Sequence, residues 1–221
     1  MRKIYKTLSV LLSYPEAEWL AYLNELQEDL QAHSQHLQML KPLFTYLSNN
    51  DLIELQENYV QLFDRTTEYA LHLFEHIHGE ERTRGQALVN LIEEYKSLGF
   101  TPAQNELPDY LPLFLELISL IPQAKAQSML SEAIHVIAHI GQQLQKTSSV
   151  YTTVFEVLES LCPVCAKPLT VAPVRTMEEA LIAFGTDECG IEPLLTPSKC
   201  SNSVQQQTIQ FMKKMQISSK G

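Results

Sequence analysis

Apolar residues recur every three or four positions along most of this chain, which is the spacing of one face of an amphipathic helix. Ile4, Leu8 and Leu11 begin this pattern near the N-terminus. Alternation of apolar and polar residues, which is typical of strands joined by tight hairpins, does not occur. The pattern therefore predicts an all-α protein with a single multi-helix domain. The expected helices cover about 2–12, 19–30, 37–47, 52–63, 67–76, 85–98, 108–120, 124–145 and 149–161.

Several residues are suited to the ends of these helices. Asp51 is a good N-cap for the fourth helix, with Glu54 at the capping-box position. Gly99 follows the sixth helix, where a glycine favours termination. Asp109 is placed to complement the dipole at the start of the seventh. These residues support the helical interpretation with a physical reason for each boundary.

The character of the sequence changes after Leu161. Five of the eleven prolines lie beyond this residue, together with a run of three glutamines. Such a composition disfavours a packed helix. We therefore expect a helical domain at 1–161 and a flexible, partly disordered C-terminal tail at 162–221.

Composition and charge restrict the class of protein. The chain has 221 residues, of which 45% are hydrophobic, so it can form a sizeable core. A net charge of -10 argues against binding to nucleic acid or anionic lipid. No run of eighteen apolar residues suggests a membrane span, and the N-terminal stretch lacks the cleavage site of a secretory signal. We expect a cytoplasmic protein without direct membrane insertion.

All four cysteines lie in the last sixty residues, so a disulfide framework for the core is excluded. Cys162 and Cys165 form a C-x-x-C pair, which is half of a zinc ribbon or a redox pair. Cys189 and Cys200 are too far apart to supply the second half. The thiols of the tail are thus either free or metal-bound, in a reducing compartment.

One string resembles a catalytic motif. His72, Glu75 and His76 match the H-x-x-E-H signature of a zinc peptidase class, and on a helix the two imidazoles would lie one turn apart. No third ligand is identifiable, and the sequence contains no phosphate loop, dinucleotide fingerprint or nucleophile elbow. We therefore predict a protein that is not an enzyme and has no metal or cofactor of its own, with a zinc hydrolase as the alternative.

Charged residues and histidines are densest at 73–85 and 106–116, close to the junctions between expected helices. So many polar groups cannot all belong to a core, and we expect a partner to bind there. The alternative is that these carboxylates only cap helices and are solvated.

Four segments, in this order, resemble the assembly chaperone, or delta subunit, of respiratory nitrate reductase. They are "LLSYP" at 11–15, "YVQLFDR" at 59–65, "LFEHIHGEERTRGQAL" at 73–88 and "ELPDYLPLFLE" at 106–116. The resemblance extends over about 2–161 and places the chain among the all-helical chaperones of molybdenum enzymes. The sequence after Leu161 departs from the family pattern.

The resemblance implies a non-catalytic cytoplasmic chaperone. It would bind the apo catalytic (alpha) subunit of nitrate reductase, mainly through the N-terminal segment of that subunit, and keep it competent for molybdenum cofactor insertion before membrane docking. A chaperone of another molybdenum enzyme, with an exported client, remains open. The oligomeric state and any direct contact with the molybdenum cofactor also remain open.

The resemblance also supplies candidate residues for partner binding. A client helix could place its apolar face against Phe63, Leu73 and Leu111, with basic residues near the carboxylates. Gly79 and Gly85 would serve the shape of the backbone. The histidines could make binding depend on pH. The candidates are Phe63, Asp64, Arg65, Glu75, His76, His78, Glu80, Arg82, Arg84, Glu106, Pro108, Asp109, Tyr110 and Leu111.

Overall fold

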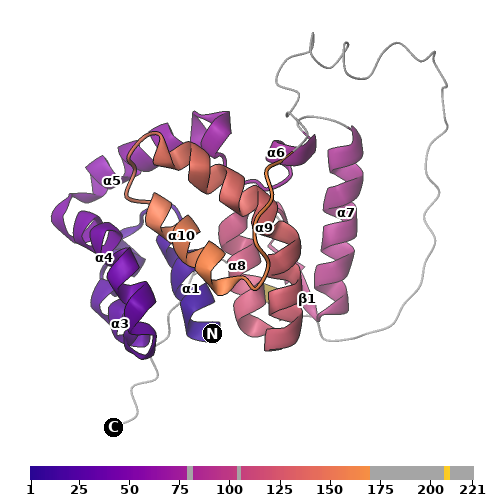
Figure 1. The fold of residues 1–221 in the computed structure, drawn as a ribbon, viewed down its shortest axis with the longest axis horizontal. Coiled ribbons are helices and arrows are strands. Elements are labelled where there is room, and N and C mark those ends of the chain that lie inside the picture. Colours follow the sequence, from indigo (N-terminus) through magenta and orange to yellow (C-terminus); the bar gives the residue numbers. More distant parts are fainter. Residues whose placement is uncertain (79–81, 104–105, 170–206, 210–221) are drawn as a thin grey trace.

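The computed structural model describes residues 1–78, 82–103, 106–169 and 207–209. Helices dominate this part of the chain, as predicted, and Figure 1 shows their arrangement. Short 3-10 turns occur at Gln31–His33 and Thr67–Tyr69. The α-helices are α1 Arg2–Leu11, α2 Ala17–Leu20, α3 Leu23–Asp29, α4 Ser34–Asn49, α5 Leu52–Tyr59, α6 Glu75–His78, α7 Arg82–Ser97, α8 Leu111–Leu120, α9 Gln123–Gln145 and α10 Thr152–Leu161.

The core lies around α1, α8, α9 and α10, with α3, α4 and α5 on one side and α7 on the other (Figure 1). Helix α8 is buried along nearly its whole length, which explains why its sequence is apolar all round. Helix α1 packs against it through an amphipathic face on which Ile4, Leu8 and Leu11 are completely buried. The two helices form the centre on which the other elements pack.

The predicted helix ends at Asp51 and Gly99 are confirmed. The Asp51 side chain accepts a hydrogen bond from the backbone N–H of Glu54 at 2.9 Å. Gly99 follows α7 with φ of +88°, a left-handed conformation that favours glycine. At both positions the residue type was sufficient to predict where the helix begins or ends.

The helix predicted at 67–76 is wrong. After a 3-10 turn the chain forms an isolated bridge at His72 and then a turn, and α6 begins only at Glu75. Leu71 and Leu73 are buried on this segment, and Leu71 O and Leu73 N–H bond to the backbone of the distant segment at 109–111. Tertiary pairing has replaced the local helical preference.

The helix predicted at 52–63 changes form part of the way along. Helix α5 ends at Tyr59, and Val60–Asp64 follows as a π-helix, closed by a bond from Arg65 N to Val60 O at 3.0 Å. Turns of π-helix are rare in proteins, and those that occur are often found at functional sites. The side chains of Leu55, Tyr59 and Phe63 are nevertheless buried along both parts.

A third difference is a pair of short strands. β1, Phe100–Pro102, pairs in parallel with β2, Gln207–Ile209. Three residues are too few for strand alternation to be visible in the sequence. The chain after α10 first lies along α9, where Lys167 N–H donates to His135 Nδ1 at 2.9 Å. The expected disorder of the tail concerns 170–206 and 210–221, which lie outside the described residues, and the domain boundary stays a prediction.

Within the described ranges, no helix is both long and apolar enough to cross a membrane.

Gly141 provides a test of the packing between α9 and α10. A Cβ atom at this position would lie 2.8 Å from Phe155 Cβ, whereas a Cβ at Gly85 meets nothing within 4 Å. Gly85, which was expected to serve the shape of the backbone, lies inside α7, and Gly79 lies outside the described residues. We expect Gly141→Ala to lower the free energy of unfolding by about 1–3 kcal/mol through overpacking.

The matched change Gly85→Ala should instead raise the free energy of unfolding, by up to about 1 kcal/mol, because alanine is the better helix former. Urea denaturation of the full chain measures both values. Stabilisation by both substitutions would contradict the close packing of α9 on α10.

Candidate functional site

The segments at 70–76 and 106–111 are joined by backbone hydrogen bonds. His72 and Tyr110 form an isolated antiparallel bridge. Leu111 N–H donates to Leu71 O at 2.8 Å, and Leu73 N–H donates to Asp109 O at 3.0 Å. Two motifs that are some thirty-five residues apart in sequence are therefore fixed side by side.

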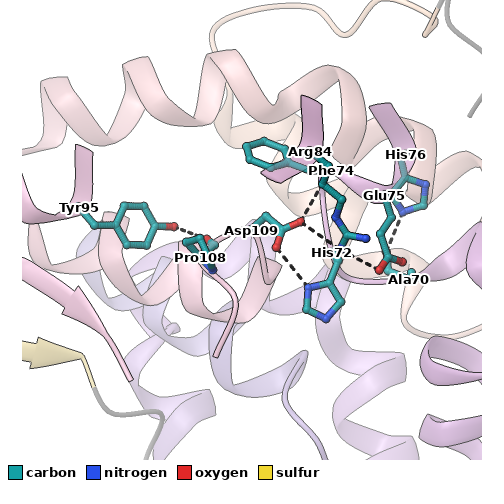
Figure 2. Close-up of polar contacts among 9 residues, drawn as sticks. All are labelled: Ala70, His72, Phe74, Glu75, His76, Arg84, Tyr95, Pro108 and Asp109. Carbon is teal, nitrogen blue, oxygen red and sulfur yellow. Dashed lines mark hydrogen bonds and ion pairs between the residues drawn. The ribbon is translucent and has the colours of Figure 1, made fainter. Parts of the chain in front are cut away.

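The carboxylate of Asp109 reinforces this pairing and is completely buried. Its Oδ2 accepts from the backbone N–H of Phe74 at 3.1 Å, and His72 Nδ1 lies 3.4 Å from Oδ1. An Arg84 Nη2 atom is 3.9 Å away and supplies the opposite charge (Figure 2). A buried charge requires such partners. Asp109 was expected to complement the dipole of α8, but it bonds to the segment before α6.

The paired segments 70–76 and 106–111 together form the motif junction. Two side chains of helix α7 contact this junction. Arg84 also donates to Glu75 Oε1 at 3.0 Å, so it joins two carboxylates (Figure 2). The Tyr95 hydroxyl donates to Pro108 O at 2.7 Å in the protein interior. Burial, with Asp109 and then Glu94 adding to it, raises the pKa of Tyr95 far above its ordinary value. Tyr95 therefore remains a neutral hydrogen-bond donor.

Two tyrosines link the junction to the other two motifs. The Tyr59 hydroxyl donates to Leu12 O at 2.9 Å and lies 3.0 Å from the Tyr110 hydroxyl. Burial raises the pKa of both phenols, so both stay neutral. The Phe63 ring packs edge-on against Tyr151, with centroids 5.1 Å apart. All four segments that carried the family resemblance thus meet in one place.

The zinc hydrolase alternative is not supported by the geometry. His72 lies in the bridge before α6, so it does not share a helix with His76 as the motif requires. His76 is buried and its Nε2 donates to Ala70 O at 2.8 Å. In the part of the chain that the structure describes, no three or more His, Cys, Asp or Glu side chains are grouped to hold a metal ion.

The candidate residues differ in their accessibility. Phe63, Leu73 and Leu111 are 4%, 4% and 0% exposed and form part of the core. The structure therefore places these three side chains inside the protein, and the expectation that they contact a client stays a prediction. Of the remaining candidates, Asp64 and Arg65 are exposed, Glu75, Arg84, Glu106 and Tyr110 are half-buried, and His76, Pro108 and Asp109 are buried. Glu80 and the side chains of His78 and Arg82 lie outside the described part.

Sequence reasoning missed a groove on the outer face of α5. Tyr14 is 39% exposed, and Ile53 is 69% exposed. Ile53 lies opposite the core-facing residues of its helix, and this unpaired apolar position was the available signal. The groove has a volume of about 530 Å³ and is lined by Tyr14, Ile53, Gln56, Glu57, Asn58, Val60, Gln61 and Arg65.

Comparison with known proteins agrees with the sequence resemblance. The family model for the nitrate reductase delta subunit matches residues 17–156. The chain is 35% identical over 158 residues to the nitrate reductase molybdenum cofactor assembly chaperone NarJ of Escherichia coli (strain K12), covering 70% of this chain and 67% of that protein. It is 32% identical over 156 residues to a probable chaperone of the same name from Bacillus subtilis (strain 168), covering 70% and 85%.

A crystal structure of a putative redox enzyme maturation protein from Archaeoglobus fulgidus has the same fold, with a TM-score of 0.56. It is 21% identical and matches 73% of this chain and 93% of that one. The structural likeness shows the fold, and the sequence matches also show the family. The chain belongs to the nitrate reductase delta subunit family. The two NarJ relatives are named as chaperones, in agreement with the prediction of a non-catalytic protein.

Removal of the Asp109 carboxylate should destabilise the protein strongly. We expect Asp109→Ala to lower the free energy of unfolding by about 3–5 kcal/mol, because it leaves Arg84 and the Phe74 N–H without their buried acceptor. Glu75→Ala, at a partly exposed partner of the same arginine, should cost about 1 kcal/mol or less. Denaturant titration distinguishes these values, and equal small losses would disprove the central role of Asp109.

Glu106 should make stability depend on pH. Burial raises the pKa of this carboxyl above its ordinary value, and the nearby His72 opposes the shift. A raised folded-state pKa gives stability that is present at low pH and is lost as the pH rises through that value. Glu106→Gln should therefore gain stability relative to the wild type between pH 4 and about pH 7.

Thermal unfolding across this pH range measures the effect, with Glu93→Gln, at an exposed position of α7, as the control. A Glu106→Gln curve parallel to that of the wild type would contradict the assignment.

Proposed function

We propose that this member of the nitrate reductase delta subunit family is a system-specific assembly chaperone for nitrate reductase. It binds the apo catalytic subunit and supports insertion of the molybdenum cofactor before the enzyme docks at the membrane. Family membership is the observation that carries the proposal, because the relatives from two distant bacteria are named for this role. The protein acts in the cytoplasm, where an unassembled client would be met.

The chemistry of the motif junction supports a role in binding. Its buried polar groups, including Asp109, Tyr95 and Tyr59, are used to hold segments of the chain together. Acidic groups remain at its edge, where Asp64 is exposed and Glu106 is half-buried. A rigid arrangement of this kind binds with little loss of conformational entropy. We propose that the surface which this arrangement supports receives the N-terminal segment of the catalytic subunit.

Deletion of the gene tests the assignment of the client. Without this chain, the purified catalytic subunit of nitrate reductase should lose most of its molybdenum, and expression of the full chain should restore it. Metal analysis of the catalytic subunit gives the readout. Normal molybdenum in nitrate reductase, together with loss of metal from a different molybdenum enzyme, would instead assign the chaperone to that enzyme.

Calorimetric titration tests the segment that is recognised. The full chain should bind the intact apo catalytic subunit, and removal of the client's N-terminal segment should weaken binding by roughly tenfold or more, or about 1.4 kcal/mol. Equal affinity for the intact and shortened clients would place recognition elsewhere on the catalytic subunit.

A further inference from the structure

The groove on the outer face of α5 is linked to the motif junction through Tyr59, which contacts the groove residue Tyr14 and the junction residue Tyr110. Helix α5 buries one face, and the opposite face presents Ile53 and Glu57, with Gln61 of the following π-helix continuing the same spacing. From Ile53 to Gln61 this face extends for about 12 Å, which equals just over two turns of a docked helix. Exposed Arg65 lies at the end of the groove, directly after the π-helix.

The segment that carries Tyr14, on one side of the groove, is held in a fixed position by hydrogen bonds. Trp19 Nε1 donates to Tyr14 O at 2.9 Å, and Gln56 Nε2 donates to Pro15 O at 2.8 Å. The Tyr14 ring stands edge-on against Tyr59, with centroids 5.5 Å apart and ring planes at 89°. Tyr59 in turn bonds to the junction. An aromatic side chain that is restrained in this way and still 39% exposed has the features of a binding anchor.

The charge around the groove selects the type of partner. Residues 51–65 contain four acidic side chains and one basic side chain. Glu57 lies within the groove and is exposed, as are Asp51, Glu54 and Asp64 nearby. A second copy of this chain would bring two acidic stretches together in a symmetric contact, which is unfavourable. A segment with basic residues beside its apolar face is complementary to this surface.

We propose that the α5 groove binds an amphipathic helix of the catalytic subunit, with apolar side chains against Tyr14 and Ile53 and a Lys or Arg beside Glu57. This inference rests on the proposed function and adds the surface and the chemistry of the bound segment. The buried residues of the junction then position the groove without touching the client. The exposed apolar residues Val89 and Leu120 lie outside the groove, on α7 and α8, and serve for comparison.

Affinity measurements with matched variants test the proposal. Ile53→Lys and Glu57→Lys change two exposed groove residues without disturbing the core, and Val89→Lys and Glu93→Lys make the same changes on α7. Each full-length variant is titrated with apo catalytic subunit from a strain that lacks the molybdenum cofactor. We expect each groove change to weaken binding by roughly tenfold or more, whereas the α7 variants bind as the wild type does.

A photo-crosslinking residue at position 53 supplies an independent readout. It should form an adduct with an amphipathic, basic segment of the catalytic subunit, and the same residue at position 89 should not. Three results would overturn the assignment of the groove and leave the chaperone function intact. They are wild-type affinity in both groove variants, equal losses of affinity in the groove and α7 variants, or an adduct at position 89 alone. Failure of the wild-type chain to bind the catalytic subunit would overturn both proposals.

Discussion

A carboxylate without solvent exposure must find its partners inside the protein, because an unpaired buried charge is strongly unfavourable. Asp109 finds them on two segments that are distant in sequence, the Phe74 backbone with His72 on one and Arg84 on the other. The segment before α6, the loop before α8 and the N-terminal part of α7 are held together as a result. The position of the candidate site depends on this single charged group.

The tyrosine hydroxyls hold further segments of the chain against the junction. Tyr95 bonds to Pro108, and Tyr59 reaches both Leu12 and Tyr110. Because burial raises the pKa of these phenols, the contacts persist throughout the physiological pH range. The outer face of α5 and the Tyr14 ring are thereby presented to solvent from a rigid support, which suits a protein whose function is to hold a client.

The sequence was informative where structure is determined locally. The helical fold class, the Asp51 cap and the Gly99 terminus follow from spacing and residue type, and the structure confirms them. The segment at 70–74 was misassigned because its strand-like pairing is with residues nearly forty positions away, and a helical pattern over so few residues is ambiguous.

The arrangement of the candidate site could be predicted only in part. The four segments that carried the family resemblance lie together in the structure, but periodicity could not show which of their side chains face inward. Phe63, Leu73 and Leu111 therefore seemed available to a client although they belong to the core. The long-range partner of Asp109 could not be inferred from neighbouring residues, since it depends on how distant segments pack.

Hydrogen exchange of the full chain, alone and with the apo catalytic subunit, tests most directly whether the four segments form one client-binding surface. The account predicts that the client slows exchange in 11–15 and 52–65, with a smaller effect at 72–76, where the junction supports the groove. Slower exchange confined to α7, with 52–65 unchanged, would contradict it.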